Sequence, residues 1–297
     1  MALVTPFNHA GAVDFDALEG LIDSMITNGV EYLVLLGTTG ETPTLSREEK
    51  ADVIHFSYEK IASRVPVVVG VGGNNTAELV HELETLPLGE ATAILSASPY
   101  YSKPSQEGIF QHYNALAKAS PRPLLLYNVP GRTGMNIQAR TILRLAEVPN
   151  IAGIKEAAGD MAQCMLVLRD RPKDFLVVSG DDALTLPQIA CGMDGVISVV
   201  ANCFPNAFSG MVRLCLKGDF AGAKKVNDTL IEAYEILFAE NNPAGVKGFL
   251  AEQGMIRNVL RLPLVPLSRE VHKRVVAFLE KGSVQANVHA KNLSRAH

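Results

Sequence analysis

One lysine, Lys155, ends the otherwise uncharged run IAGIK, which gives it the surroundings of a nucleophile rather than of a surface cation. Burial among apolar residues disfavours the ammonium form of a lysine, and the neutral amine can attack a carbonyl group to form an imine. The alternative is a strand-end lysine that extends to solvent or pairs with the neighbouring Glu156. The run alone leaves both interpretations open.

Hydroxyl groups follow several other apolar runs. Tyr127 follows PLLL, and its phenol could carry protons to and from a carbinolamine. Tyr101 also follows an apolar run, and so do Thr38 and Thr39, which are next to each other in the sequence. Imine formation needs such groups, because water must leave and protons must move. Core packing is the alternative for Tyr127, and a plain turn between glycines is the alternative for the two threonines.

Arg132 lies in the turn PGRTG, shortly after Tyr127. A guanidinium held near a strand end is suited to bidentate binding of a carboxylate. A surface arginine without a role is the alternative. Gly180 and Asp181 follow a later apolar run, where we expect them to shape a turn.

The elements that carry these residues are short, β-branched apolar runs that alternate with amphipathic stretches. Several runs are continuously apolar, which is typical of parallel strands buried on both faces. The predicted strands cover residues 2–7, 31–37, 66–72, 91–97, 123–130, 151–157, 175–181 and 195–202.

Helix starts separate these strands. The candidates are Ser46 with Glu49 three residues later, Ser105, Asp160, Asp182 and Pro205. Eight β/α units predict an α/β fold, a closed (β/α)8 TIM barrel, with catalytic groups at the carboxyl ends of the strands. An open doubly wound sheet is the alternative. It calls for a glycine-rich phosphate loop, which GVGGNN at residues 70–75 matches poorly.

The chain divides into three predicted parts. Residues 1–219 form the barrel, and residues 220–281 form a C-terminal helical extension with helices over 220–238, 243–255 and 268–281. Residues 282–297 are polar and aperiodic, which predicts a disordered tail.

Composition restricts the classes of partner. The 297 residues carry a formal net charge of -4 with scattered basic residues, which gives no basis for binding nucleic acid or an anionic membrane. No apolar run approaches the roughly 20 residues of a membrane helix, and the start lacks a secretory signal pattern. Four widely spaced cysteines without a C-x-x-C pair indicate reduced thiols and a cytoplasmic protein.

Metal and phosphate patterns are missing from the expected strand ends. No His, Asp and Glu cluster has metal-ligand spacing, so we expect no metal. The loops after the last two predicted strands lack a glycine-rich cradle, which disfavours a phosphorylated substrate.

Long motifs in a fixed order carry a family resemblance from residue 2 to about residue 281. They are ALVTPF, GTTGET, SPYYSKPSQEG, YNVPGRTG, GIKEAAGD, SGDD, GVISV, the NP…K element of residues 242–247 and LRLPLVPLS. Together they resemble the dihydrodipicolinate synthase / N-acetylneuraminate lyase family of pyruvate-dependent aldolases. YNVPGRTG is similar to the dihydrodipicolinate synthase branch, where the arginine matched by Arg132 binds the carboxylate of aspartate semialdehyde.

The resemblance implies a Schiff-base-forming lyase. Lys155 would bind pyruvate as an imine and enamine, with no separate cofactor, and condense it with L-aspartate β-semialdehyde to 4-hydroxy-tetrahydrodipicolinate. This reaction is the first committed step of diaminopimelate and lysine biosynthesis.

The resemblance also assigns the other site residues. Thr39, Tyr127 and Tyr101 would form the proton relay, with Tyr101 contributed by a neighbouring subunit of a homodimer or a dimer-of-dimers homotetramer. Thr38 and Thr39 would hold the pyruvate carboxylate, whereas Gly180 and Ile197 would line the pocket.

Two departures from the family pattern stand out. The family's first strand usually begins several residues before ALVTPF, so either the start is mis-assigned or the first strand is short. Lysine-inhibited members often carry histidines at the positions of Arg47 and Lys50. The corresponding allosteric lysine site would comprise Thr42, Arg47, Lys50, Asn74, Glu78 and Tyr100. Two additional cations repel a cationic ligand, which predicts weak or absent lysine feedback.

Two other functions remain as alternatives. The chain could be a sibling aldolase acting on N-acetylneuraminate or a 2-keto-3-deoxy sugar acid, a reading against which Arg132 argues. It could also be a catalytically silent barrel that serves as a binding protein. The combination of Lys155, Tyr127, Thr39 and Tyr101 argues against that reading.

Overall fold

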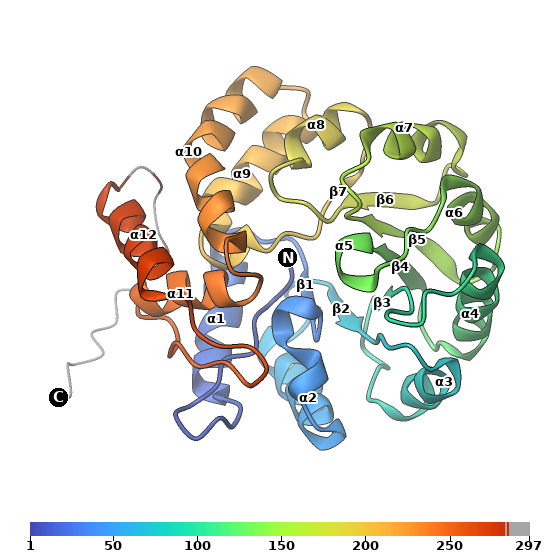
Figure 1. The fold of residues 1–297 in the computed structure, drawn as a ribbon, viewed down its shortest axis with the longest axis horizontal. Coiled ribbons are helices and arrows are strands. Elements are labelled where there is room, and N and C mark those ends of the chain that lie inside the picture. The colour runs from blue at the N-terminus through green and yellow to red at the C-terminus, as the bar shows by residue number, and fades with distance from the viewer. Residues whose placement is uncertain (283, 285–297) are drawn as a thin grey trace.

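A curled parallel sheet forms the centre of the molecule in the computed structural model, which describes residues 1–282 and 284 (Figure 1). Its strands follow one another in chain order, and every neighbouring pair is parallel. The seven strands are β1 (Leu33–Leu35), β2 (Val67–Gly70), β3 (Ala93–Ala97), β4 (Leu124–Asn128), β5 (Ile151–Glu156), β6 (Leu176–Ser179) and β7 (Gly195–Val196). This arrangement confirms the α/β class and the parallel order.

Residues 1–4 lie between the two edges of this sheet. The Ala2 amide donates to the Ser198 carbonyl at 2.8 Å, and the Leu3 amide donates to the Val34 carbonyl at 2.9 Å. The predicted strand over residues 2–7 is nevertheless wrong in extent. It is reduced to one parallel bridge between Ala2 and Val34, and Phe7 makes an antiparallel bridge to Val13 instead.

The predicted strand over residues 195–202 is also too long. β7 ends at Val196, and a 3-10 helix, η3 (Val200–Asn202), occupies the end of the predicted segment. The buried Asp182 explains this turn, because its Oδ2 accepts hydrogen bonds from the amides of Val199 and Val200 at 3.0 and 2.8 Å. These amides are therefore not available to a strand ladder.

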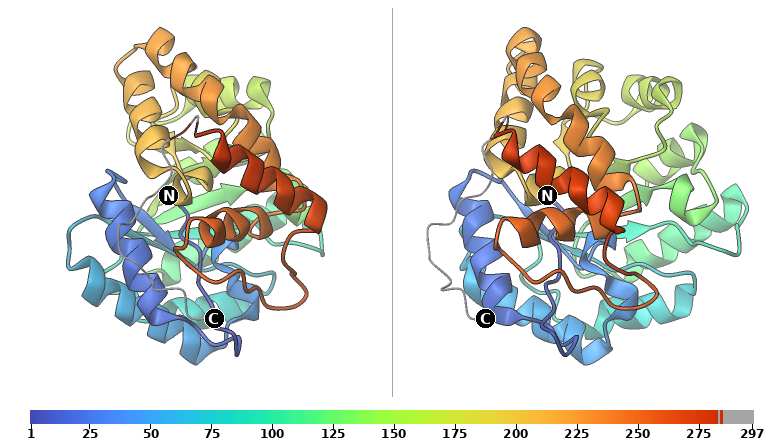
Figure 2. Two further views of the ribbon diagram at one scale, coloured as in Figure 1. Left: turned by 90° about the vertical axis from the view of Figure 1, so that its left-hand side faces the viewer. Right: turned by 60° about the vertical axis from the view of Figure 1, so that its left-hand side comes forward.

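Helices surround the sheet, and the last three gather on one side of the molecule (Figures 1 and 2). None of the helices in the described part of the chain is long and apolar enough to cross a membrane. They are α1 (Phe15–Thr27), α2 (Arg47–Ile61), α3 (Thr76–Thr85), α4 (Gln106–Ala119), α5 (Pro130–Thr133), α6 (Ala139–Ala146), α7 (Met161–Asp170), α8 (Thr185–Ala190), α9 (Pro205–Leu216), α10 (Phe220–Phe238), α11 (Ala244–Glu252) and α12 (Arg269–Glu280).

Most of the predicted helix starts are confirmed. Ser46 and Glu49 form a capping box, Ser105 and Asp160 cap α4 and α7, and Pro205 occupies the first turn of α9. The start predicted at Asp182 is wrong. Its carboxylate binds the amides before η3, and α8 begins three residues later at Thr185. Of the predicted tail over residues 282–297, all but Gly282 and Val284 lie outside the described residues.

Successive side chains of each strand point to opposite faces of the sheet, so the apolar side chains form two separate clusters. The larger one packs the helices against the outside of the sheet. A smaller cluster lies inside the curl and includes Val34, Val68, Leu95, Tyr127 and Ile197. Because successive strand residues point to opposite faces, side chains in register with Tyr127 also point inward. This geometry brings Lys155 to the inner face.

One buried histidine lies between two outer helices. His112 of α4 is 4% exposed, and its Nδ1 lies 2.8 Å from the hydroxyl oxygen of Thr76 on α3. Burial lowers the pKa of His112 to about 4. The folded protein therefore holds a neutral imidazole at pH values where the unfolded chain takes up a proton.

We expect acid to destabilise the fold through His112. The folded-state pKa is the lower one, so stability is full above the unfolded value of about 6.5 and is lost as the pH falls toward 4. The expected loss between about pH 7 and pH 5 is about 2 kcal/mol. Urea unfolding of wild type and His112→Gln at both pH values measures it. An equal pH dependence in the two proteins would exclude His112 as the cause.

Candidate active site

Two predicted site residues face each other on adjacent strands. Tyr127 of β4 and Lys155 of β5 are Cα partners in the parallel register. The Lys155 Nζ lies 4.3 Å from the centroid of the Tyr127 ring. Lys155 is 4% exposed and Tyr127 is 7% exposed, so both lie in a low-dielectric setting. An amine and a phenol are thus held within reach of one substrate.

The proposed pairing of Lys155 with Glu156 does not occur. Glu156 is on the opposite face of β5, where its carboxylate accepts hydrogen bonds from Asn128 Nδ2 at 2.9 Å and from the Ala158 amide at 2.7 Å. Burial raises the pKa of Glu156, although these donors oppose the shift. Neighbouring strand residues point to opposite faces, so Glu156 cannot neutralise Lys155.

Gly180, directly after β6, allows the Lys155 side chain to pass. A Cβ at position 180 would lie 2.8 Å from Lys155 Cε and 2.7 Å from Ala157 Cβ. Both separations are too short for non-bonded carbons. Glycine is therefore required at this position if Lys155 is to keep its course into the site.

A cavity of about 310 Å³ opens above Lys155 and Tyr127. It collects most of the predicted site residues, which come from the ends of different strands as expected. The predicted residues that line it are Thr38, Thr39, Tyr127, Arg132, Lys155 and Gly180. Such a cavity can hold a small keto acid against the amine, with hydroxyls for proton transfer and a guanidinium for a carboxylate.

Two predicted residues are not part of this lining. Ile197 belongs to the inner apolar cluster and lines a second, mainly apolar cavity of about 430 Å³. That cavity lies at the amino ends of the strands, away from Lys155 Nζ. Tyr101 is 89% exposed and has a left-handed backbone with a φ of 69°. It does not line the cavity of its own chain.

Arg132 reaches the cavity from α5, the short helix that follows β4. It is exposed, and its Nη2 donates to the carbonyl of Asn242 at 3.4 Å. Most of its donors thus remain available for a ligand.

Asn242 is a cavity residue that the sequence did not identify. It precedes α11, is 5% exposed, and donates from Nδ2 to Thr39 Oγ1 at 2.9 Å. Because the Thr39 oxygen accepts this hydrogen bond, its own proton is free to point elsewhere. Asn242 begins the NP…K element of residues 242–247, which is part of the family resemblance. The contact itself could not be predicted, because Thr39 lies far from Asn242 along the chain.

The residues of the predicted lysine site are distributed around α2 and α3. Lys50 Nζ lies 2.9 Å from Glu82 Oε1, and Arg47 Nη1 lies 3.2 Å from His81 Nε2. Asn74 Nδ2 donates to the Tyr100 carbonyl at 3.4 Å. The predicted site also includes Thr42, which donates to the Gly37 carbonyl at 3.0 Å, and the exposed Glu78.

The described residues contain no group of three or more His, Cys, Asp or Glu side chains that could hold a metal ion. Among the described residues, Arg132 is the only cation besides Lys155 itself that lines the Lys155 cavity.

The chain is similar to known proteins of one family. Residues 1–282 match the dihydrodipicolinate synthetase family. A 4-hydroxy-tetrahydrodipicolinate synthase of Azobacteroides pseudotrichonymphae is 48% identical over 93% of both chains.

Two solved structures are also similar. One is the 4-hydroxy-tetrahydrodipicolinate synthase of Methylacidiphilum fumariolicum, with a TM-score of 0.92 and 40% identity over 95% of both chains. The other is a dihydrodipicolinate synthase of Acinetobacter baumannii complexed with pyruvate. It has a TM-score of 0.93 and 40% identity, with coverage of 96% of this chain and 98% of that one. The chain therefore belongs to the dihydrodipicolinate synthetase family.

Proposed function

We propose that this chain condenses pyruvate with L-aspartate β-semialdehyde to form 4-hydroxy-tetrahydrodipicolinate, the first committed step of diaminopimelate and lysine biosynthesis. The family relationship supports a lyase of this type. The observation that carries the chemistry is the buried Lys155 amine, whose Nζ lies 4.3 Å from the Tyr127 ring centroid in a cavity that also contains Arg132.

The reaction begins at Lys155. Its neutral amine attacks the keto carbon of pyruvate, and the carbinolamine loses water to give an imine. Loss of a methyl proton gives an enamine, whose carbon forms a bond to the aldehyde carbon of the second substrate. The aldehyde oxygen takes up a proton and becomes a hydroxyl. The amino group of the adduct then attacks the imine carbon, closes the ring and releases Lys155.

Hydroxyls move the protons of these steps. Thr39 and Tyr127 line the same cavity as Lys155, and Tyr101 would complete the relay from a neighbouring subunit. Thr38 and Thr39 would hold the pyruvate carboxylate, whereas Arg132 would hold the carboxylate of the semialdehyde. The covalent pyruvate imine serves in place of a separate cofactor.

The exposed Tyr101 supports an oligomer in which each site is completed by a neighbour. We propose a homodimer or a dimer-of-dimers homotetramer in the cytoplasm. Within the chain, residues 1–4 would add one strand to the seven of the sheet and so close a (β/α)8 barrel over residues 1–219. Helices α10 to α12 would form an extension over residues 220–281.

Substrate assays test the proposed function. Purified protein given pyruvate is expected to consume L-aspartate β-semialdehyde and to leave N-acetylneuraminate and 2-keto-3-deoxy sugar acids unchanged. Arg132→Met is expected to raise the KM for the semialdehyde more than that for pyruvate, because it removes only the second carboxylate contact. Preferential cleavage of a sugar acid would identify a sibling aldolase. Inactivity toward all of these substrates would favour a binding protein.

We further propose that L-lysine inhibits this protein weakly or not at all. Lys50 is paired with Glu82, but Arg47 adds a cation to the predicted lysine site, and like charges repel. Initial rates are expected to be unchanged by millimolar lysine. The double variant Arg47→Gln/Lys50→Gln should gain sensitivity if these charges are the cause. Strong inhibition of the wild type would contradict the prediction.

A further inference from the structure

The turn that carries Thr39 is bounded by two residues in an unfavourable backbone conformation. It contains the 3-10 helix η1 (Thr38–Gly40), and the flanking Leu36 and Glu41 have φ angles of 54° and 52°. The left-handed region costs a residue with a side chain roughly 1–2 kcal/mol. Contacts from outside the turn must therefore maintain this shape.

The Glu41 carboxylate supplies two such contacts. Glu41 is 1% exposed, and its Oε1 lies 2.5 Å from Nζ of Lys247, which is on α11 and fully buried. Its Oε2 accepts a hydrogen bond from the Arg261 amide at 3.0 Å. The strained residue at the end of the turn is thus held by two groups from the last quarter of the chain.

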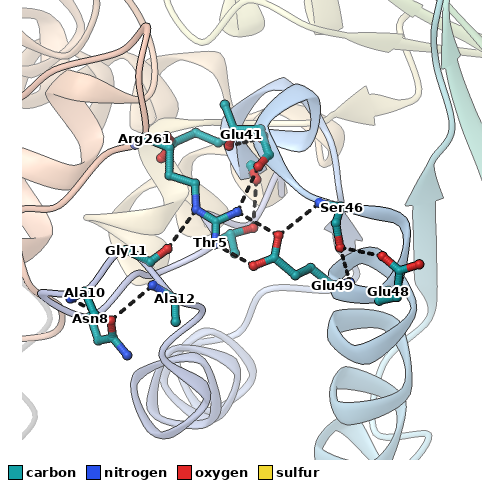
Figure 3. Close-up of polar contacts among 12 residues, drawn as sticks. Thr5, Asn8, Ala10, Gly11, Ala12, Glu41, Ser46, Glu48, Glu49 and Arg261 are labelled. Atoms are coloured by element: carbon teal, nitrogen blue, oxygen red, sulfur yellow. Dashed lines mark hydrogen bonds and ion pairs between the residues drawn. The ribbon is translucent and has the colours of Figure 1, made fainter.

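Both of these groups are themselves fixed. Lys247 Nζ donates to the Val259 carbonyl at 3.0 Å and lies 4.1 Å from the centroid of the Phe7 ring. Figure 3 shows the Arg261 guanidinium anchored between Glu49 and Gly11. Its Nη1 and Nη2 lie 2.7 and 2.5 Å from the two Glu49 oxygens, and its Nε donates to the Gly11 carbonyl at 2.8 Å.

A stability role alone does not explain this arrangement. A buried ion pair is often no more stabilising than apolar residues of the same volume, because removing two charges from water is costly. What such a pair does provide is a defined geometry. Here the geometry belongs to the turn whose middle residue, Thr39, accepts a hydrogen bond from Asn242 and faces the Lys155 cavity.

We propose that Glu41 is a positioning residue of the active site, clamped by Lys247 and the Arg261 amide so that the Thr39 hydroxyl is aligned for proton transfer. The inference rests on the proposed function, because it assigns Thr39 to the relay. Through this clamp α11 and the segment that follows it position a catalytic turn near the other end of the sequence. Neither Glu41 nor Lys247 lines the Lys155 cavity.

The variant Glu41→Gln tests the proposal, because it keeps the size of the side chain and removes its charge. We expect kcat to fall roughly 10- to 100-fold, since small misplacements of catalytic groups have effects of this size. Exchange of pyruvate methyl protons with D2O, without the second substrate, should slow by a similar factor. Lys155 should still be labelled completely by pyruvate and borohydride at long times.

Further variants separate positioning from folding. Glu41→Gln/Lys247→Met removes both charges and is expected to recover the wild-type Tm while kcat and exchange stay low. Arg171→Met removes the ion pair with Asp194 at the amino ends of the strands, and should lower the Tm without changing kcat. Of the two single variants at position 247, Lys247→Arg retains the cation and should keep more activity than Lys247→Met.

The outcomes distinguish this inference from the proposed function. Wild-type kcat and exchange in folded Glu41→Gln, or full recovery of both in the double variant, would overturn the positioning role. Failure of pyruvate and borohydride to label wild-type Lys155 would instead overturn the proposed function.

Discussion

Replacing Lys155 with methionine is expected to abolish turnover while leaving the fold intact. The amine forms the bond to pyruvate, so its removal should lower kcat on the order of 10⁴- to 10⁶-fold, as for other covalent nucleophiles. Methionine fills most of the same volume and leaves no buried polar group in need of a partner, so the Tm should be equal or higher. Steady-state kinetics with both substrates and thermal unfolding measure the two effects.

A second substitution separates nucleophilicity from charge. Lys155→Arg keeps a long basic side chain near the Tyr127 ring, but a guanidinium stays protonated and does not form the imine. We expect it to be as inactive as Lys155→Met. Activity of either variant within 10-fold of the wild type would mean that Lys155 is not the nucleophile.

Replacing Tyr127 with phenylalanine removes only the phenol hydroxyl. General acid–base groups contribute roughly 10²- to 10⁴-fold, and we expect kcat to fall within that range. The ring remains, so the packing of Lys155 is retained. The exchange of pyruvate methyl protons should slow with kcat, whereas the final extent of borohydride labelling should be unchanged.

Tyr113→Phe is the matched control for this effect. Tyr113 is fully buried on α4, and its hydroxyl donates to the Ser96 carbonyl at 2.9 Å outside the cavity. Its loss should lower the free energy of unfolding by about 1–3 kcal/mol and leave kcat unchanged. If Tyr127→Phe also retained wild-type kcat, the relay would have to be assigned to other groups.

Much of the fold follows from local patterns in the sequence. The apolar run 151–157 predicts β5, and the serine–glutamate spacing at Ser46 and Glu49 predicts the first turn of α2. The error at Asp182 has a non-local cause. An aspartate after a strand is typical of a helix cap, but this carboxylate binds amides that lie 17 and 18 residues further along the chain.

In the candidate site, too, some residues follow from local sequence patterns and others depend on contacts between distant parts of the chain. Lys155 and Tyr127 could be predicted because each ends an apolar run, and parallel register places such ends side by side. Asn242 and Lys247 could not be assigned in this way. Their partners, Thr39 and Glu41, lie about 200 residues away, and only the packing of α11 against the catalytic turn brings them together.

Borohydride reduction in the presence of pyruvate traps the imine that the proposed reaction requires at Lys155. We expect peptide mass spectrometry of the wild-type protein to find one added, reduced pyruvate on the peptide that contains Lys155. The modification should be absent without pyruvate and absent from Lys155→Met. An unmodified Lys155 peptide after complete reduction, or a modification on another lysine, would show that Lys155 is not the nucleophile.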